Sequence, residues 1–404
     1  MNNNSEFYQV LFRGMRFGGG APKSSYHYLK VLKDHGSHIT VLSEPCEDAI
    51  AELYGNTFDK IFFEKNPTQL SNEHKYLKIY FQMLKEYFFI KKVKPDFVII
   101  LGHVNAFFYA QFCSKLNINN LILIAGGDLS NSSLFLTKTP TDHVICFSEE
   151  NKDVLVDYLE NDRITVISNR IQLKYVFDDL NSHYNFEKNS TLNILLTSRV
   201  SSDKYNSILA FIENINEVSD IIGTNISLTI AGDGDKFEDL KKAVANIKNP
   251  ALNVILKGHV DDLLPEFEKA HLVVGKGRSV VEPIMMNRIG CVIGNDGKVE
   301  FCSKDNFDRL YHYNFSGRNL ECDNPVECIK NFLIDLKMSD YNLSVITETS
   351  ELVRKYYSSE FLEDKFMDVL NRLVPSERKT KHVSVLFLTL KLLWYKLKQR
   401  KVKH

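Results

Sequence analysis

Residues 191–234, "TLNILLTSRVSSDKYNSILAFIENINEVSDIIGTNISLTIAGDG", decide the fold. The pattern of apolar residues predicts a strand at 191–199, a helix at 204–217 and a second strand at 227–234. Apolar runs this short and continuous are typical of strands that are covered on both faces, as in parallel sheets. The order strand, helix, strand therefore predicts a parallel βαβ unit, in which ligands bind outside the carboxyl ends of the strands.

The same alternation extends in both directions along the chain. Downstream, we expect a helix at 235–246 and a short helix from about Val280, with strands at 253–260, 271–277 and 290–296. Upstream, a helix is expected at 21–36, with strands at 7–14, 37–44, 96–102, 120–127, 143–149 and 164–169. The polar segment 172–190 interrupts the rhythm, and we interpret it as a linker. Two such series predict an α/β protein of two doubly wound, Rossmann-like domains with parallel sheets, and the cleft between them is the expected ligand site.

Length and composition agree with this organisation. A chain of 404 residues suits two domains, and 44% hydrophobic with 25% charged residues is typical of a soluble globular protein. The seven cysteines contain no C-x-x-C pair, which predicts reduced thiols in a cytosolic compartment. The first residues lack the basic and apolar regions of a signal peptide, so we expect a cytoplasmic protein.

The charge is concentrated at one end. Residues 378–404 hold nine Lys and Arg and no Asp or Glu, which leaves a net charge of −10 on the rest of the chain. An acidic body argues against nucleic-acid binding. Val383, Leu386, Leu390, Leu393 and Leu397 form one helical stripe, and the apolar run is shorter than the roughly 20 residues that span a bilayer. We expect a basic amphipathic tail on the cytoplasmic face of a membrane, with an oligomerisation helix or a helix packed on the body as alternatives.

Two β–α loops are candidates for anion binding. "RFGGGAPKSS" places Gly18, Gly19 and Gly20 between a strand and its helix, where backbone N–H groups can approach a ligand closely. A flexible turn is the structural alternative. "TSRVSSDK" places Arg199 and Lys204 five residues apart, so both can clamp a diphosphate at the edge of the sheet. Two solvated surface cations are the alternative there.

The loop "VVGKGRSVVEP", residues 273–283, has two interpretations. It lacks the spacing of the nucleotide-triphosphatase loop. Ser279 and Glu282 have the S-x-x-E spacing of a capping box, although Pro283 would lose a backbone hydrogen bond in that register. Alternatively, the loop exposes N–H groups to an anion, Lys276 or Arg278 adds positive charge, and Glu282 accepts hydrogen bonds from ligand hydroxyls.

Evidence for a metal site is weaker. Asp233 and Asp235 form a D-x-D pair that could chelate a metal ion, but Asp235 also lies where a helix cap or a first-turn acid belongs. No His/Cys cluster has zinc spacing, and no G-x-S-x-G elbow is present. We therefore expect no metal and no cofactor.

The order of these pieces resembles the retaining glycosyltransferases of family 4, also called glycosyl transferases group 1, over residues 8–373. The similar segments are "FGGGAPKSSYHYLKVLKDHGSHITVLSE", "VICFSEENKDVL" with "ITVISNRI", "SRVSSDK", "LTIAGDG", "VILKGHVDD" and "GKGRSVVEPIMMNRIGCVI". The resemblance implies the GT-B fold, in which two Rossmann-like domains face each other across a cleft. It also implies transfer of a sugar from a nucleoside-diphosphate donor.

The resemblance assigns roles to individual residues. Arg199 and Lys204 would stabilise the charge that develops on the leaving diphosphate, and Asp128 is kept from the family's H-G-x-D segment. Glu282 would bind the donor ribose. The remaining donor-binding candidates are Gly19, Gly20, Gly258, His259, Val260, Gly277, Arg278 and Ser279.

Five positions depart from the family pattern. Val274 stands where the family has the first of two glutamates, Ala125 replaces a histidine, Arg170 and Ser198 each replace a glycine, and Pro283 replaces an alanine. The departure at Val274 affects the contacts to the transferred sugar. Val274, Ala125 and Arg170 keep open a sugar-nucleotide-binding protein without transferase activity. A sugar-nucleotide epimerase of the same fold is a second rival, and it would need acid/base carboxylates or histidines in the cleft.

The resemblance also implies partners and boundaries. The expected donor is of the UDP or GDP type, and the expected acceptor is a glycan or a lipid-linked glycan in surface polysaccharide or glycolipid synthesis. The expected domains are 1–178, the acceptor side, and 179–355, the nucleotide-sugar side. Residues 356–375 are expected to return to the first domain, and 376–404 form the tail.

Overall fold

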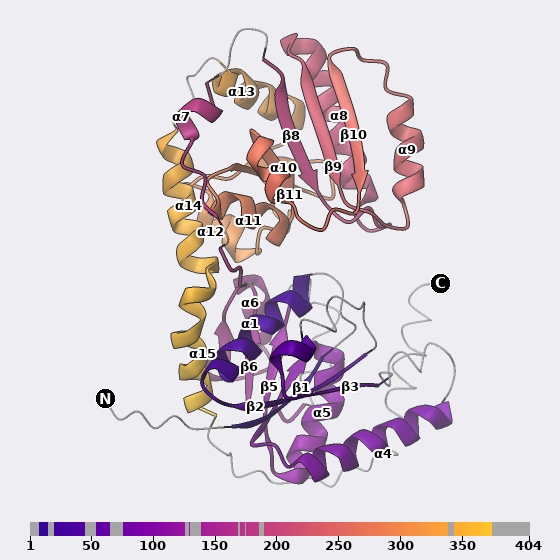
Figure 1. Ribbon diagram of the computed structural model, residues 1–404, viewed down its shortest axis with the longest axis vertical. Coiled ribbons are helices and arrows are strands. Elements are labelled where there is room, and N and C mark those ends of the chain that lie inside the picture. The colour runs from indigo at the N-terminus through magenta and orange to yellow at the C-terminus, as the bar shows by residue number, and fades with distance from the viewer. Residues whose placement is uncertain are drawn as a thin grey trace. The chain divides into compact units, whose positions relative to one another are not determined.

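A computed structural model describes residues 8–14, 20–44, 54–64, 76–125, 129, 139–168, 170–173, 175–185, 190–337 and 343–373. The chain divides into two compact units (Figure 1). Unit 1 comprises residues 1–170 together with 362–404, and unit 2 comprises residues 171–361. Both units are α/β with mainly parallel sheets, which confirms the predicted fold class.

Unit 1 is built on a seven-stranded parallel sheet of order β3-β2-β1-β4-β5-β6-β7. Its strands are β1 (Gln9–Arg13), β2 (His38–Ser43), β3 (Lys60–Phe63), β4 (Phe97–Leu101), β5 (Asn119–Ile124), β6 (His143–Cys146) and β7 (Ile164–Val166). Its helices are α1 (Gly20–Asp34), α4 (Tyr76–Val93), α5 (His103–Leu116), α6 (Glu149–Leu155), the 3₁₀ turn η2 (Asn161–Arg163) and α15 (Leu362–Asn371).

Successive side chains of the central strands are buried on opposite faces of this sheet. Leu11, Val98 and Ile122 pack with α4, α5 and α6, whereas Val10 and Phe12 pack with α1 and α15. Burial on both faces explains why the sequence of these strands is continuously apolar rather than alternating. The edge strand β3 is mostly exposed and was not predicted, because its sequence "KIFF" lacks such a run.

Unit 2 is built on a six-stranded sheet of order β10-β9-β8-β11-β12-β13, in which only the β12–β13 pair is antiparallel. Its strands are β8 (Leu192–Thr197), β9 (Ile226–Ala231), β10 (Leu252–Gly258), β11 (Leu272–Gly275), β12 (Ile289–Ile293) and β13 (Val299–Phe301). Its helices are α7 (Leu180–His183), α8 (Tyr205–Ile222), α9 (Phe237–Ala245), α10 (Leu264–Lys269), α11 (Arg278–Met285), α12 (Phe307–His312), α13 (Pro325–Lys337), α14 (Ser344–Tyr357) and the 3₁₀ turn η3 (Ser359–Phe361).

The sheet of unit 2 is also covered on both faces (Figure 1). Ile194, Leu228 and Val274 pack against α8, α9 and α13. Val273 and Val292 point to the other face, which is covered by α10, α11, α12 and α14. The predicted βαβ unit of residues 191–234 is therefore confirmed as β8, α8 and β9.

The predicted linker is part of unit 2. Phe177 is buried, its N–H donates to the Met286 carbonyl at 3.2 Å, and Asn287 Nδ2 donates to the Phe177 carbonyl at 3.0 Å. These contacts place the division at Arg170/Ile171 and at Phe361/Leu362, a few residues from the boundaries expected at 178/179 and 355/356. Helix α15 belongs to unit 1, where Phe366 packs edge-on against Tyr28 with ring centroids 5.1 Å apart.

One expectation about the cysteines is wrong. Cys322 and Cys328 form a disulfide, whereas the absence of a C-x-x-C pair predicted reduced thiols throughout. Cys322 precedes α13 and Cys328 lies in its first turns, so the entry into the helix brings their Cα atoms within 6.8 Å. Cys113, Cys146, Cys291 and Cys302 are buried thiols outside any disulfide, which agrees with the prediction.

Candidate functional site

The candidate site lies at the carboxyl edge of the sheet of unit 2. The strand order reverses direction between β8 and β11, since β9 and β10 lie on one side of β8 while β11 and β12 lie on the other. Ligands of open α/β sheets bind at such a switch point, outside the carboxyl ends of the strands. The loops that follow β8 and β11 carry most of the residues that the sequence singled out.

The loop after β8 leads from Ser198 into α8. Arg199 is exposed, and Lys204 is half-buried and caps the N-terminus of α8. The first N–H groups of a helix have no partner within the helix, so this end of α8 favours an anion. Gly232, which follows β9, lies so close that a Cβ there would come within 1.8 Å of the Ser198 carbonyl oxygen, and its φ is +149°. The ends of β8 and β9 are therefore tightly packed beneath the loop.

The loop after β11 leads into α11, and its geometry excludes the capping box. Gly277 caps α11 with a φ of +58°, which places Ser279 and Glu282 inside the helix rather than at its cap and third position. Ser279 Oγ instead accepts from the Lys276 N–H and donates to the Lys276 carbonyl, each at 3.1 Å. Ser279 thus fixes the conformation of the loop from Gly275 onward.

Pro283 lies within α11 and cannot donate to the carbonyl of Ser279, four residues earlier. Thr197, the last residue of β8, fills this place, since its Oγ1 donates to the Ser279 carbonyl at 3.1 Å. The hydroxyl therefore satisfies a partly buried acceptor and ties α11 to the neighbouring strand. The sequence did not indicate this role for Thr197.

Basic side chains gather around Lys276. Burial is the main cause that lowers the pKa of the Lys276 ammonium to about 8, and the positive charges of Lys204 and Arg318 contribute to this lowering. Asp203 and Asp296 act in the opposite direction. Lys204 and Arg318, from two other loops, thus lie within electrostatic range of Lys276, and cations gathered in this way favour a polyanion such as a diphosphate.

Arg318 is a candidate that the sequence analysis missed. It lies in the loop after α12, which approaches α11 because the Gly277 N–H donates to the Phe315 carbonyl at 2.6 Å. Gly317, beside Arg318, has a φ of +79°, and a Cβ there would meet the Ile293 carbonyl oxygen at 2.0 Å. The sequence "SGRN" has a glycine beside an arginine, as an anion-binding loop can have. This loop could not be assigned to the edge of the sheet from the sequence, because no predicted strand precedes it.

Glu282 and Arg278 interact with each other. Both side chains are half-buried, and Arg278 Nε lies 3.4 Å from Glu282 Oε2 in an i,i+4 pair on α11. Asn295, which follows β12, accepts a hydrogen bond from Lys276 Nζ. Lys204 lies at the start of α8, whereas Gly277, Ser279 and Glu282 lie at the start of α11 or within it. These two helices follow the neighbouring strands β8 and β11.

Asp233 and Asp235 have local partners. Asp235 accepts hydrogen bonds from the backbone N–H and the hydroxyl of Ser202, which joins the loops after β8 and β9. The N-cap of α9 is Lys236, one residue after the Asp235 that the sequence analysis considered for this position. Within the part of the chain that the structure describes, no group of three or more His, Cys, Asp or Glu side chains could hold a metal ion.

Three of the predicted donor residues lie further along the edge. Gly258 ends β10 with a φ of +69°, His259 is exposed and contacts Asp261 at 3.1 Å, and Val260 packs beside α10. β10 is separated from β11 by β9 and β8, a distance of roughly 14 Å at the usual strand spacing. The described contacts do not join these three residues to the cluster around Lys276.

Several predicted positions belong to unit 1 or to its margins. Gly19 and Asp128 lie outside the described residues, as does the tail 376–404. Gly20 is the first residue of α1, and Ala125 follows β5 and packs against the core. In unit 2, Val274 is fully buried in β11 among the residues facing α8 and α13, so this position makes no contact at the site.

No protein-family model matches the sequence, and no curated protein matches it either. Solved structures are similar over almost the whole chain. HepE from Anabaena, in complex with UDP-glucose, is similar over 90% of this chain and 99% of its own, with 12% identity and a TM-score of 0.63. A glycosyltransferase from Rickettsia africae is similar over 91% of this chain and 98% of its own, with 15% identity and a TM-score of 0.63.

The fold is GT-B. A putative UDP-N-acetylglucosamine 2-epimerase from Listeria monocytogenes is also similar, over 94% of this chain and 100% of its own, with 12% identity and a TM-score of 0.56. At such identities a likeness shows the GT-B fold alone. The function therefore has to be argued from the residues at the carboxyl edge of unit 2.

Proposed function

We propose that this GT-B protein is a retaining glycosyltransferase of family 4 that takes a sugar from a nucleoside-diphosphate donor. The observation that carries the proposal is the cluster of Lys204, Lys276 and Arg318 at the switch point of unit 2. Two helices, α8 and α11, begin at the same edge. Their N-termini and the three cations together favour a ligand with several negative charges, such as a diphosphate.

The proposed chemistry follows from this charge. When the bond between the anomeric carbon and the diphosphate breaks, negative charge develops on the leaving phosphate. Cations fixed in advance stabilise that charge more than they stabilise the intact donor, which lowers the barrier. Arg199, Lys204 and Lys276 are the proposed contributors, and Glu282 is the proposed ribose ligand. Because the cations neutralise the leaving group, we propose that no metal ion is needed.

The acceptor and the membrane complete the proposal. We propose a glycan or lipid-linked glycan acceptor that approaches from unit 1, with Gly19, Gly20 and Asp128 on that side, in surface polysaccharide or glycolipid synthesis. The basic tail 378–404 is proposed to hold the enzyme on the cytoplasmic face of a membrane. Deletion of residues 378–404 should move the protein from the membrane fraction to the soluble fraction, and an unchanged distribution would remove the tail from this role.

Nucleotide binding provides the first test. Thermal unfolding is measured with UDP, GDP, CDP and ADP, and a matching ligand at 100 times its dissociation constant should stabilise the protein by about 2.7 kcal/mol. The shift should largely disappear in Lys204→Ala and in Lys276→Ala. It should persist in the control Lys248→Ala, an exposed lysine elsewhere in unit 2. If none of the four nucleotides stabilises the parent protein, the proposal fails.

Turnover provides the second test. With the sugar nucleotide that matches the binding result, Arg199→Ala and Lys204→Ala should each reduce transfer about 100-fold, because each removes a charge that acts on the transition state. Activity should persist in EDTA. Complete loss that Mn²⁺ or Mg²⁺ restores would instead implicate Asp233 and Asp235.

The epimerase remains the second candidate, favoured by the likeness to the Listeria structure. An epimerase would convert the sugar of the nucleotide without any acceptor. Incubation with the donor alone, followed by analysis of the sugar, separates the two functions. Binding without either reaction would favour a sugar-nucleotide-binding protein.

A further inference from the structure

Helix α4 of unit 1 presents aromatic rings to solvent. Ile79, Met83 and Ile90 pack into the core, which defines the inner face of the helix. Phe81 and Phe88 lie on the opposite face, seven residues apart, and are 64% and 58% exposed. The inner face of this helix is already packed, and the two phenylalanines lie in register on its outer face. They form a surface that the described residues of the unit leave uncovered.

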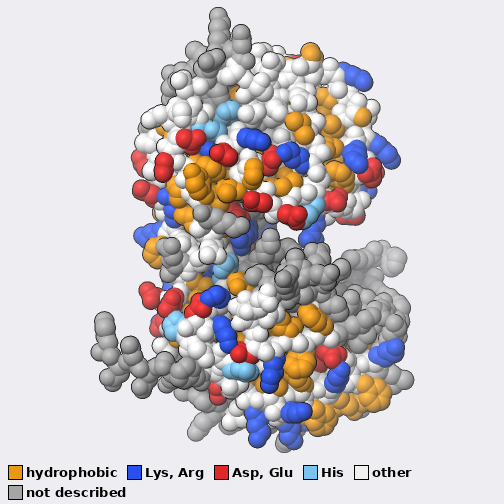
Figure 2. All heavy atoms as spheres, in the orientation of Figure 1, with side chains coloured by type: hydrophobic (Ala, Val, Ile, Leu, Met, Phe, Trp, Pro, Cys, Tyr) orange, Lys and Arg blue, Asp and Glu red, His pale blue; other side chains and the backbone are white. Residues whose placement is uncertain are grey.

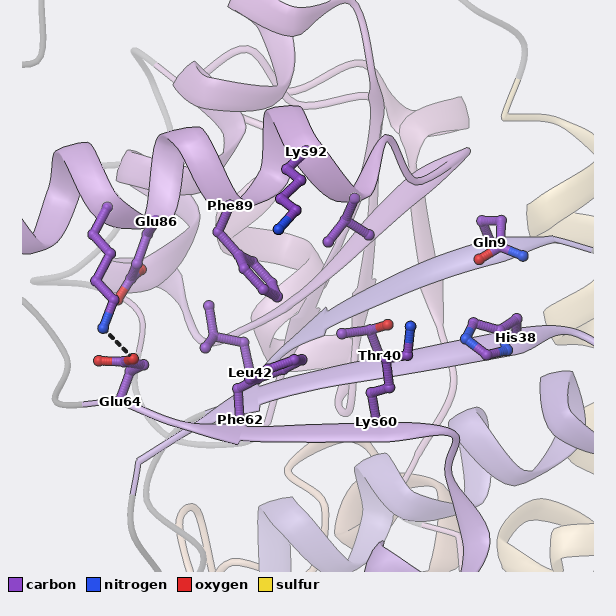
Figure 3. A pocket seen from close by; sticks show the side chains of 12 residues that line it. Gln9, His38, Thr40, Leu42, Lys60, Phe62, Glu64, Glu86, Phe89 and Lys92 are labelled. Carbon is purple, nitrogen blue, oxygen red and sulfur yellow. Dashed lines mark hydrogen bonds and ion pairs between the residues drawn. The ribbon is translucent and has the colours of Figure 1, made fainter.

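A groove adjoins this outer face. It is a cavity of about 570 Å³ between α4 and the edge strands β2 and β3 (Figure 3). Leu42, Phe62 and Phe89 give it an apolar lining, and Phe62 packs edge-on against Phe89 with ring centroids 5.0 Å apart. Phe62 is nevertheless 40% exposed, so the apolar surface continues from the groove to solvent.

Lysines border both the groove and the outer face of α4. Lys60 and Lys92 line the groove, and Lys78 lies one turn before Phe81. Among the described residues, none of these three lysines forms an ion pair. Lys85, which lies between the two phenylalanines, pairs with Glu64 (Figure 3). Figure 2 shows hydrophobic and basic side chains gathered together over α4.

Two acidic residues line the groove, and neither offsets this charge. Glu64 pairs with Lys85, whereas Glu86 is buried and lies 3.2 Å from Arg13, which also donates to Tyr109 Oη at 2.6 Å. Burial raises the pKa of Glu86, and the Arg13 charge opposes this. The pair is internal to the unit, so the outer surface keeps the charge of its lysines.

We propose that the surface formed by Lys60, Phe62, Lys78, Phe81, Phe88 and Lys92 binds an anionic membrane. Lysines at a membrane surface attract anionic headgroups, and exposed aromatic and apolar side chains enter the boundary between headgroups and acyl chains. The apolar groove offers further surface to a lipid chain. Among the described helices, none is long and apolar enough to cross a bilayer, which fits contact at the membrane surface.

Charge and apolarity together favour lipid over the other occupants. A second copy of the chain would bring two lysine-bearing patches together across a two-fold axis, and their like charges would repel. A nucleic acid fits poorly because the body of the chain outside the tail carries a net charge of −10. The proposal does not depend on the proposed activity, and it concerns a surface separate from the tail.

Vesicle co-sedimentation of the full-length protein tests this proposal. Phosphatidylcholine vesicles are compared with vesicles that also contain phosphatidylglycerol. The parent should bind the anionic vesicles, and less so at high salt. Two double variants should each weaken binding roughly tenfold or more. One combines Phe81→Ser with Phe88→Ser, and the other combines Lys78→Gln with Lys92→Gln. All four side chains lie on the surface, so the fold should be retained, as circular dichroism would verify.

Matched controls lie on unit 2. Ile221→Ser removes another hydrophobic side chain that is 55% exposed, and Lys242→Gln with Lys248→Gln removes two exposed lysines. Both controls should bind vesicles like the parent. The proposal is overturned if the parent ignores anionic vesicles or if the α4 variants bind as well as the controls. It is also overturned if the phenylalanine variant changes only the oligomeric state in size-exclusion chromatography with light scattering.

Discussion

At the scale of single residues, Lys276 distinguishes this site from a set of ordinary surface cations. Its ammonium is partly buried and feels the charges of Lys204 and Arg318, so its pKa is about 8. The charge that this residue offers to an anion therefore changes close to neutral pH. An arginine in its place would remain charged at any physiological pH.

The first prediction concerns the pH dependence of nucleotide binding. Above about pH 8, Lys276 loses its proton in the free protein, so the affinity for a nucleoside diphosphate should fall as the pH rises. Lys276→Arg should keep its affinity up to about pH 9.5, because the guanidinium stays protonated. Isothermal titration calorimetry at several pH values measures both. Parallel pH profiles in the two proteins would contradict the assigned role of Lys276.

The second prediction concerns acid stability. Burial lowers the pKa of His143 in unit 1 and of His271 in unit 2 to about 4. In the unfolded chain the pKa of a histidine is near 6.5. Between about pH 4 and pH 6.5 the unfolded chain therefore binds more protons than the folded protein. The free energy of unfolding should be largest above about pH 6.5 and should decrease as the pH falls toward 4.

His271→Asn tests this linkage. In the parent protein the Asn193 N–H donates to His271 Nδ1 at 2.9 Å, and the side-chain oxygen of the new Asn can accept the same hydrogen bond. Urea unfolding between about pH 4.5 and 7 should show a slope reduced by up to one proton, about 1.4 kcal/mol per pH unit. An unaltered slope in His271→Asn would remove His271 as a source of acid instability.

Sequence reasoning at this scale identified residues next to predicted strands and missed the others. Arg199, Lys204 and the loop at Gly277 were found because they follow apolar runs whose carboxyl ends must share one edge. Arg318 reaches the same edge from a loop beyond α12, and no local pattern indicates that. Thr197 was missed because its partner, the Ser279 carbonyl, is a backbone atom 82 residues away.

At the scale of elements, α11 shows how a proline is accommodated inside a helix. The missing N–H of Pro283 leaves the Ser279 carbonyl without its helical donor, and Thr197 supplies a hydroxyl. The helix that presents Gly277 and Ser279 is thereby held against β8. This strand also leads to Arg199 and Lys204, so one hydrogen bond connects the two halves of the candidate site.

The third prediction is a double-mutant cycle on this bond. Thr197→Val should destabilise the protein by roughly 1 kcal/mol, because it leaves a partly buried carbonyl without a donor. Pro283→Ala restores a backbone N–H to the helix, so Thr197→Val should cost much less in that background. Thr197→Ser, which keeps the hydroxyl, is the control. Urea unfolding measures the free energy of unfolding of the two single variants, the double variant and Thr197→Ser. If the effects of Thr197→Val and Pro283→Ala are additive, Thr197 does not compensate for the missing N–H of Pro283.

The elements that the sequence predicted well are those covered on both faces. β1, β4, β5 and β8 contain continuous apolar runs, and burial by helices on either side explains them. β9 instead alternates Ile226, Leu228 and Ile230 with polar residues. β3 and β13 lie at the edges of their sheets, where fewer neighbours cover the strand and the pattern is weaker. The capping box failed for a tertiary reason, since Gly277 rather than Ser279 ends the loop.

At the scale of the whole molecule, the chain enters unit 2 at residue 171 and returns to unit 1 at residue 362. The returning helix α15 contributes Leu362, Phe366 and Val369 to the core of unit 1. His35 Nε2 lies 3.1 Å from Glu363, and Asn119 Nδ2 donates to the Leu373 carbonyl at 3.0 Å. Unit 1 is therefore complete only with residues from both ends of the described chain.

The fourth prediction follows from this return. Phe366→Ala should destabilise unit 1 by about 3–5 kcal/mol, because it removes a fully buried ring that packs on Tyr28. Hydrogen exchange should show faster exchange in α1 and β1, with α8 and β9 of unit 2 unaffected. The exposed Phe361→Ala, five residues earlier, is the control. Equal exchange in both units would contradict the assignment of α15 to unit 1.

The return of α15 also sets the order in which the protein can be completed during synthesis. Domains commonly fold from the N-terminal end as they leave the ribosome. Here the unit that is made first cannot close its core until every residue of unit 2 has been translated. On the face of its sheet that holds Phe12 and Val41, α1 can pack early, but the place of α15 stays unfilled for that whole interval. We expect nascent chains stalled before residue 362 to be cleaved readily by protease in unit 1 and to depend on chaperones until the last helix arrives.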